Sequence, residues 1–203
     1  VNSHLNVYSF NKIIKLEEIN KLKKELNLKD FNNMFGSIET QGLVINDSFS
    51  KGVIIRGYSE INTNHYLYKS LLSEKKSSID FDKIIIGDAL AKELGLKIGD
   101  QLKLAIPKTD KSLLGNIPRF KTLKVDGIFD FGMYEYDSSF VFISLELSQK
   151  LLLYDNGSFN RIEFYLDDPS LVDNFKNSVD SKINNKKLNL YTLSWMDRNS
   201  SLM

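Results

Sequence analysis

The sequence has 203 residues, of which 42% are apolar and 11% aromatic, so it can bury a hydrophobic core as one domain or two small subdomains. Its 27 basic and 26 acidic side chains give a net charge of +1, which provides no general cationic field and argues against nucleic acid as a partner. The absence of cysteine excludes disulfide bonds and thiolate metal sites but does not fix the cellular compartment.

The N-terminal segments predict strands and one amphipathic helix. HLNVYSF alternates as a strand does, and in the next segment Leu16, Ile19, Leu22 and Leu26 recur at helical spacing. The segments GSIETQGLVI and SKGVIIRGYS then read as two strands on either side of a turn at residues 46–48, and we expect them to pair.

The middle of the chain contains the clearest local pattern, KIIIGDALAKELGLKIGDQLKLAIP. A β-branched strand is followed by Asp88, which can cap a short helix, and Gly95 can end that helix in a left-handed conformation. A second strand follows. Capping, turning and core packing explain every residue here, so this strand-helix-strand unit indicates no chemistry by itself.

A polar arm, PKTDKSLLGNIPRFK, comes next. Its two prolines bracket a lysine-bearing excursion with Leu113 and Leu114 near its middle. A loop that only connects two strands does not need water-facing leucines, so we expect another molecule to cover them.

The C-terminal part alternates again between strands and helices. Two strands are expected on either side of FGMYEYDS, then a helix from Ser144, the strand NRIEFYLDD, a helix behind Pro169 and the strand LNLYTL. Because a strand followed by a helix is expected at both chain ends, we predict an α+β fold with two subdomains. Residues 1–60 and 157–195 would form a split βαβ subdomain, and residues 61–156 an inserted, β-rich subdomain with the arm.

Known catalytic patterns are missing from the sequence. His4 and His65 do not have metal-ligand spacing, and no phosphate-binding loop or nucleophile elbow is present. Four aspartates occur in pairs, but each pair lies at a strand edge or before a proline turn: Asp80, Asp82, Asp167 and Asp168. The sequence therefore predicts no catalytic, metal-binding or cofactor-binding residue, although an enzyme with an unrecognised site remains an alternative.

Three long segments support a family resemblance: IIIGDALAKELGLKIGDQLKL, GNIPRFKTLKVDGIFDFGMYEYDSSFVFISLELSQKLL and RIEFYLDDPSLVDNF. With the C-terminal SWMDRNSSLM, they resemble the periplasmic domain of lipoprotein-releasing ABC transporter permeases, the LolC/LolE family. These permeases share a periplasmic core domain with macrolide exporters. The resemblance runs in order from about Lys83 to the C-terminus and is weaker before it.

The resemblance implies an architecture and a set of partners. Such a domain lies between the first two membrane helices of an inner-membrane permease, so both termini are expected to leave it on one side. Residues 196–203 would lead into a membrane helix, and the subdomain built from both chain ends would be porter-like. ATP hydrolysis would occur on a separate cytoplasmic subunit. Further expected partners are lipoprotein substrates, a sister permease or second copy, and a soluble LolA-like periplasmic lipoprotein chaperone.

The resemblance also implies a chaperone-binding site. In the permease that recruits the chaperone, a β-hairpin hook enters an apolar cavity, and a basic pad lies beside the hook. The hook corresponds here to residues 107–118, in particular Pro107, Leu113, Leu114, Gly115, Ile117 and Pro118. The pad corresponds to Lys103, Arg119 and Lys121. Phe120 departs from the family pattern, which has a polar residue at that position.

Two functions therefore follow from the resemblance. The first is the periplasmic domain of a lipoprotein-releasing permease, which helps extract lipoproteins and pass them to the chaperone. The alternative is a core domain of a related exporter or cell-division permease that transmits ATP-driven motion to another periplasmic partner.

Overall fold

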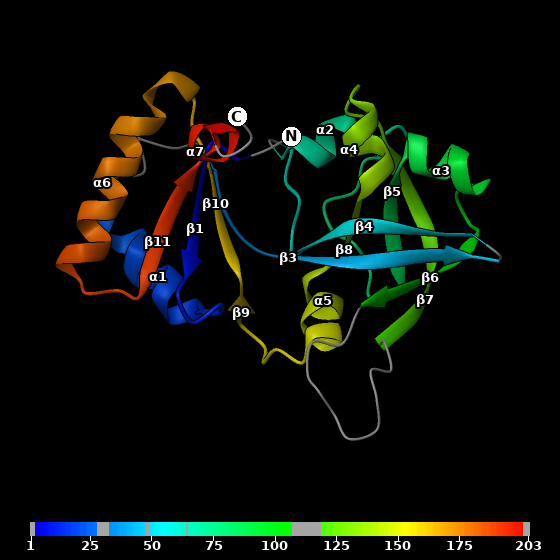
Figure 1. The fold of residues 1–203 in the computed structure, drawn as a ribbon, viewed down its shortest axis with the longest axis horizontal. Helices are drawn as coiled ribbons and strands as arrows, with labels where there is room; N and C mark the ends of the chain where they lie inside the picture. The colour runs from blue at the N-terminus through cyan, green and yellow to red at the C-terminus, as the bar shows by residue number, and fades with distance from the viewer. Residues whose placement is uncertain (1–2, 28–32, 48, 64, 107–118, 201–203) are drawn as a thin grey trace. The chain divides into compact units, whose positions relative to one another are not determined.

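The computed structural model of this chain describes residues 3–27, 33–47, 49–63, 65–106 and 119–200. Strands and helices alternate along it, which confirms the predicted mixture of α and β structure (Figure 1). The chain forms two compact units. Unit 1 joins Val1–Ser37 to Asn156–Met203, and unit 2 is the continuous segment Ile38–Asp155.

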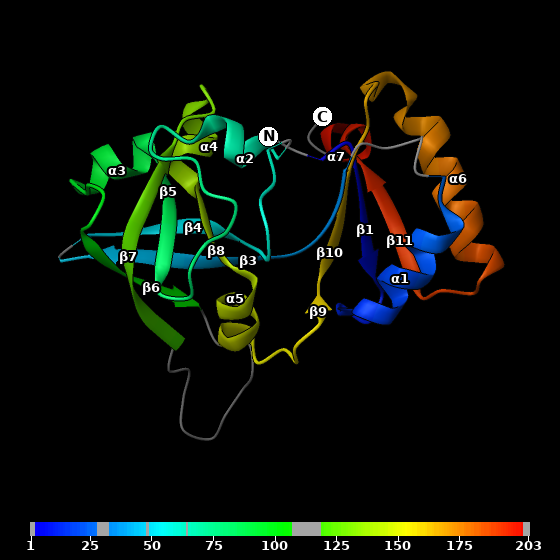
Figure 2. The ribbon, with the colours of Figure 1, turned by 180° about the vertical axis from the view of Figure 1, so that it is seen from behind.

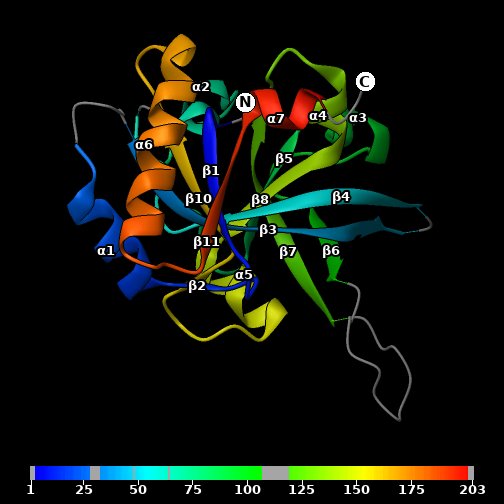
Figure 3. The same ribbon diagram turned by 60° about the vertical axis from the view of Figure 1, so that its left-hand side comes forward.

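Unit 1 is built on an antiparallel sheet with the strand order β11-β1-β10-β3. Helix α1 joins β1 to β3, and helix α6 joins β10 to β11, so each helix links two parallel strands that have a third strand between them. Both helices lie on the same side of the sheet (Figure 3). The elements are β1 (Leu5–Ser9), β2 (Ile14–Lys15), α1 (Leu16–Glu25), the first part of β3 (Asn33–Asn46), β9 (Ser158–Phe159), β10 (Arg161–Tyr165), η1 (Pro169–Leu171), α6 (Val172–Asn185), β11 (Leu190–Ser194) and α7 (Trp195–Ser200).

The apolar faces of α1 and α6 explain why these helices form and where they pack. Helix α1 buries Ile19 and Leu22, as their spacing predicted, whereas Leu16 at its start is 50% exposed. Helix α6 buries residues at intervals of three or four, and Phe175 packs against Phe164 of the sheet with ring centroids 5.3 Å apart. This helix-facing side of the sheet therefore forms the core of unit 1.

The ends of the sheet strands place both described chain ends together in unit 1. Leu5 at the start of β1 lies opposite Ser194 at the end of β11, and the Trp195 amide donates to the His4 carbonyl at 3.0 Å. The start of β1 and the end of β11 therefore lie at the same end of two neighbouring strands. Among the described helices, none combines the length and apolarity needed to cross a membrane.

Unit 2 is a closed β-barrel. Its strands follow the ring β3-β4-β8-β5-β7-β6, and β6 pairs back to β3 through Lys103, Leu104 and Ala105. Strands β5 and β7 run side by side in parallel (Figure 2). The elements besides β3 are β4 (Phe49–Tyr58), α2 (Tyr66–Ser70), β5 (Lys83–Gly87), α3 (Asp88–Leu94), β6 (Gln101–Ile106), β7 (Arg119–Phe129), α4 (Tyr134–Ser139), β8 (Phe140–Ser144) and α5 (Leu145–Leu152).

The local signals for α3 and α5 are confirmed with one difference. Gly95 ends α3 with a φ of 64°, and the Ser144 hydroxyl accepts a hydrogen bond from the Leu147 amide at the start of α5. Asp88 is not the N-cap of α3 as predicted, because Gly87 occupies that position and Asp88 begins the first turn. Its carboxylate instead pairs with Lys92 one turn later.

The predicted boundary at residue 60 is wrong. Residues 38–60 belong to unit 2, because β3 continues as one strand from Asn33 to Asn46 and its second part pairs with β4 inside the barrel. Strand β4 also pairs with β8, so the hairpin that the sequence assigned to the first subdomain forms part of the barrel wall.

Gly87 marks a close contact between two backbones in unit 2. A Cβ atom at this position would lie 2.0 Å from the Asp137 carbonyl oxygen of α4. We expect Gly87→Ala to lower the free energy of unfolding by about 1–3 kcal/mol, because the backbone of β5 or of α4 would have to move to relieve this clash. Urea denaturation measures this change. Gly52→Ala is the control, since its Cβ would meet nothing within 4 Å and should not reduce stability; equal stabilities of the two variants would contradict the contact.

Candidate partner-binding site

The predicted hook, residues 107–118, lies outside the described residues, but the structure describes the residues on either side of it. Pro107, Leu113, Leu114, Gly115, Ile117 and Pro118 all fall in that segment. Strand β6 ends at Ile106 and β7 begins at Arg119, and these two residues lie directly opposite each other. The hook segment therefore starts and finishes at neighbouring points of one antiparallel strand pair.

The strand pair below the hook segment is firmly held by the barrel. Its register continues without a break from Ile106 and Arg119 to Gln101 and Lys124. One face of the pair points into the core, where Leu102, Leu104 and Leu123 are each at most 2% exposed. A segment that leaves this pair has a rigid base.

The three predicted pad residues do not share one face of the strand pair. Lys103 is exposed on the outer face, opposite Thr122. Arg119 and Lys121 lie opposite Ile106 and Leu104, and therefore on the other face. The Arg119 guanidinium donates to the Leu151 carbonyl at the end of α5 at 2.8 Å, which ties the base of β7 to that helix.

A further basic residue, Lys150 of α5, lies near Lys121, although the sequence did not single it out. The ammonium groups of Lys121 and Lys150 are 5.3 and 4.8 Å from the centroid of the Phe81 ring. In the part of the chain that the structure describes, neither lysine forms an ion pair. Lys150 is an ordinary exposed position of α5 in the sequence, and only the fold places it beside Lys121.

The two histidines considered in the sequence have structural roles. The His4 imidazole accepts a hydrogen bond from the Leu166 amide at 2.8 Å, and burial lowers the pKa of this histidine. His65 caps α2 by accepting from the Leu67 amide. Among the described residues, no three potential metal ligands gather at one point.

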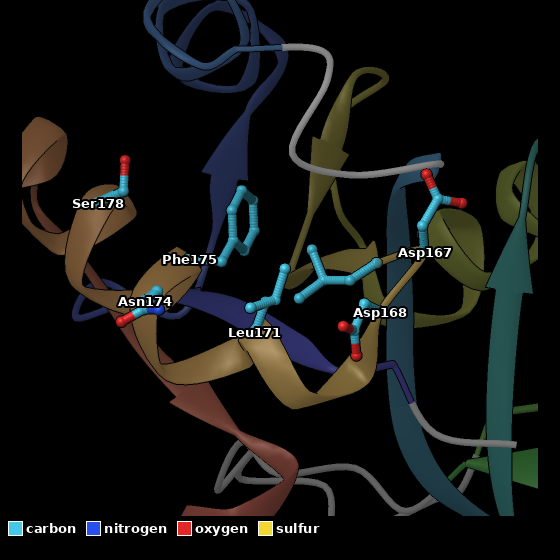
Figure 4. Close-up of a pocket in the computed structure, with 7 residues that line it drawn as sticks. Asp167, Asp168, Leu171, Asn174, Phe175 and Ser178 are labelled. Carbon is cyan, nitrogen blue, oxygen red and sulfur yellow. The ribbon is translucent and has the colours of Figure 1, made fainter.

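A pocket of about 290 Å³ in unit 1 is lined by one of the two aspartate pairs noted in the sequence, Asp167 and Asp168 (Figure 4). It lies between the segment after β10 and helix α6. The Asp168 carboxylate accepts hydrogen bonds from the Ser170 hydroxyl and amide, which lower the pKa of Asp168, so this group already caps η1. The residues that line the pocket are Leu166, Asp167, Asp168, Leu171, Asn174, Phe175 and Ser178.

Comparisons with curated proteins give relatives named LolC, while no family model matches the chain. The lipoprotein-releasing system transmembrane protein LolC of Xylella fastidiosa is 29% identical over 82 residues, which are 40% of this chain and 20% of that protein. LolC of Buchnera aphidicola is 28% identical over 171 residues, or 78% of this chain and 41% of that protein. The chain thus matches less than half the length of these relatives.

Solved structures share the fold at low identity. The extracellular domain of the noncanonic ABC-type transporter YknZ from Gram-positive bacteria superposes with a TM-score of 0.58 at 12% identity, over 95% of this chain and 100% of that one. The periplasmic region of MacB from Actinobacillus actinomycetemcomitans superposes with a TM-score of 0.58 at 8% identity, over 98% of this chain and 91% of that one. The resemblance to periplasmic domains of LolC-type and MacB-type permeases is therefore confirmed.

Proposed function

We propose that this chain is the periplasmic domain of a permease in a lipoprotein-releasing ABC transporter and that it passes lipoproteins to a soluble periplasmic chaperone. The observation that best supports this role is the β6/β7 strand pair on the wall of a barrel, in which Ile106 and Arg119, the residues on either side of the proline-bracketed segment, lie opposite each other. The similarity to LolC supports the substrate class.

The hook residues provide the apolar contact in this proposal. Leu113, Leu114 and Ile117 enter an apolar cavity of the chaperone, and Gly115 allows the chain to reverse between them. Pro107 and Pro118 restrict the backbone at either end and reduce the entropy that binding costs.

The basic residues at the base of the hook attract the chaperone before contact. Lys103 presents its charge on one face of the strand pair, and Lys121 together with Lys150 on the other. Charges around the rim of an interface act mainly on the association rate and on its salt dependence. An acidic rim on the chaperone would complement both faces.

The split βαβ unit formed by both chain ends is the porter-like subdomain in this proposal. Its adjacent ends at Leu5 and Ser194 suit a connection to two membrane helices of one permease, with residues 196–203 leading into one of them. The permease then works with a sister subunit or a second copy, and a cytoplasmic subunit hydrolyses ATP. The alternative is a core domain of a related exporter or cell-division permease that transmits ATP-driven motion to another periplasmic partner, and the fold shared with the YknZ and MacB domains supports it.

Binding to the chaperone separates the two functions. Calorimetry with the purified periplasmic lipoprotein chaperone of the same organism should show saturable binding to this chain, and absence of binding would favour the exporter alternative. We further expect Lys103→Glu combined with Lys121→Glu to slow association by roughly tenfold at low salt. Stopped-flow rates measure this effect. Lys21→Glu combined with Lys24→Glu, a matched double charge reversal at exposed positions of α1 in unit 1, serves as the control; equal slowing by both variants would point to general charge effects.

A further inference from the structure

We propose that Asn156 is a site of spontaneous deamidation, where water converts the side-chain amide to a carboxylate and leaves part of the molecules with an iso-aspartyl linkage in the main chain. Asn156 and Gly157 form the only Asn-Gly dipeptide in the sequence. They follow Asp155, the last residue of unit 2, so the dipeptide begins the second segment of unit 1. The reaction needs no partner and is independent of the proposed function.

The chemistry of this reaction uses only the chain and water. The backbone nitrogen of Gly157 loses its proton and attacks the side-chain carbon Cγ of Asn156, so a C–N bond forms, the Cγ–Nδ2 bond breaks and the amide nitrogen leaves as ammonia. The product is a cyclic succinimide. Water then opens the ring at one of its two carbonyl carbons: opening at Cγ gives aspartate, and opening at the main-chain carbonyl gives iso-aspartate, whose peptide bond runs through the side chain. Glycine is the most favourable following residue, because no Cβ atom hinders the attack.

The backbone conformation favours glycine at position 157. Its φ is 74°, in the left-handed region where a residue with a Cβ atom is strained. The Gly157 carbonyl accepts a hydrogen bond from the Leu16 amide at 2.9 Å, and the next residue, Ser158, pairs with Lys15 in the β2/β9 ladder. The fold therefore selects, directly after Asn156, the residue type that leaves the attacking nitrogen unhindered.

Asn156 is accessible, and no hydrogen bond in the described part of the chain protects it. The residue is exposed in the irregular segment between α5 and β9. Among the described residues, neither its side chain nor the Gly157 N–H group has a hydrogen-bond partner, so no bond has to break before the attack. Asn177 also precedes a small residue, Ser178, but both lie within helix α6, where the helical hydrogen-bond ladder holds the backbone nitrogen. We therefore expect Asn156 to react well before Asn177.

An iso-aspartyl linkage at this position lengthens the main chain by one carbon atom just before an anchored residue. The extra atom must displace the Gly157 carbonyl from the Leu16 amide or distort the turn that precedes β9. Loss of one such hydrogen bond should lower the thermal unfolding midpoint of the purified iso-aspartyl form by about 2–4 °C. Asn156→Asp carries the same charge without the additional atom, so it should melt like the unmodified chain. Equal midpoints for Asn156→Asp and the iso-aspartyl form would contradict this consequence.

Incubation of the folded chain beside a short peptide tests whether Asn156 reacts. The chain and a synthetic peptide with the sequence of residues 153–159 are kept in mildly alkaline buffer. Protein iso-aspartate methyltransferase then quantifies the iso-aspartate in each sample, and mass spectrometry of proteolytic fragments locates it. We expect the rate in the folded chain to lie within about tenfold of the rate in the peptide, because no hydrogen bond holds the dipeptide back. The fragment that contains Asn177 should stay unmodified.

Asn156→Gln is the matched control, because its longer side chain must close a larger and less favourable ring and should yield no iso-aspartate. A rate in the folded chain below that tenfold range would show that the fold protects Asn156 and would overturn the proposal. Equal amounts of iso-aspartate from Asn156→Gln and the unmodified chain would place the reaction at another residue, and the proposal would again be wrong.

Discussion

Replacing Leu113 and Leu114 together with aspartate is expected to abolish binding to the chaperone and to leave the thermal unfolding midpoint of the chain nearly unchanged. Burying two leucine side chains contributes on the order of 3–5 kcal/mol before ordering costs, and aspartates in an apolar cavity would add a desolvation penalty. Calorimetry measures the affinity and scanning fluorimetry the midpoint. Both readouts are needed, because the prediction assigns these leucines to binding and not to the core.

A conservative double substitution provides the control for this prediction. Leu113→Met with Leu114→Met keeps the apolar volume of the segment and should retain most of the affinity. The hook proposal would be wrong if the aspartate variant still bound the chaperone, or if it unfolded at a much lower temperature.

The second large effect concerns stability and involves the buried ion pair of Arg161 and Glu163 on β10. Their side chains are 1% and 0% exposed, and the guanidinium also donates to the Ser37 hydroxyl at 3.3 Å. Arg161→Met should lower the free energy of unfolding by about 3–5 kcal/mol, because it leaves the Glu163 carboxylate buried without its cation. Chemical denaturation measures the difference.

Two further variants show whether the loss comes from the unpaired charge. Arg161→Met combined with Glu163→Leu removes both charges and should restore most of the stability, because an apolar pair of similar size tolerates burial. Lys92→Met breaks the exposed pair with Asp88 and should leave stability unchanged. A double variant as unstable as the single one would show that the guanidinium acts through packing instead.

Local signals were sufficient to predict several elements. The strand-helix-strand segment around α3 follows from the left-handed stop at Gly95, and α6 follows from its apolar spacing behind Pro169. In these segments the residues that decide the structure lie within a few positions of each other. The pairing of β3 with β4 was predictable for the same reason, since a short turn joins them.

Long-range pairing explains what the sequence did not predict. The barrel closes through three residue pairs between β3 and β6, which are far apart in the chain, and no local pattern encodes that register. The boundary between the units was misplaced for this reason. The candidate site shows the same limit. The family resemblance grouped Lys103 and Lys121 in one pad, whereas the strand register places them on opposite faces of the strand pair. Lys150 lies near Lys121 only through the fold.

The pairing of Leu5 with Ser194 has a consequence for the order in which the chain folds during synthesis. Unit 2 is one continuous segment, so all of its strands are available once Asp155 has been made. Strand β1, although synthesised first, has both of its partners, β10 and β11, in the last part of the chain. We therefore expect the barrel to fold while β1 still lacks both partner strands, and unit 1 to complete its sheet only after β11 has left the ribosome.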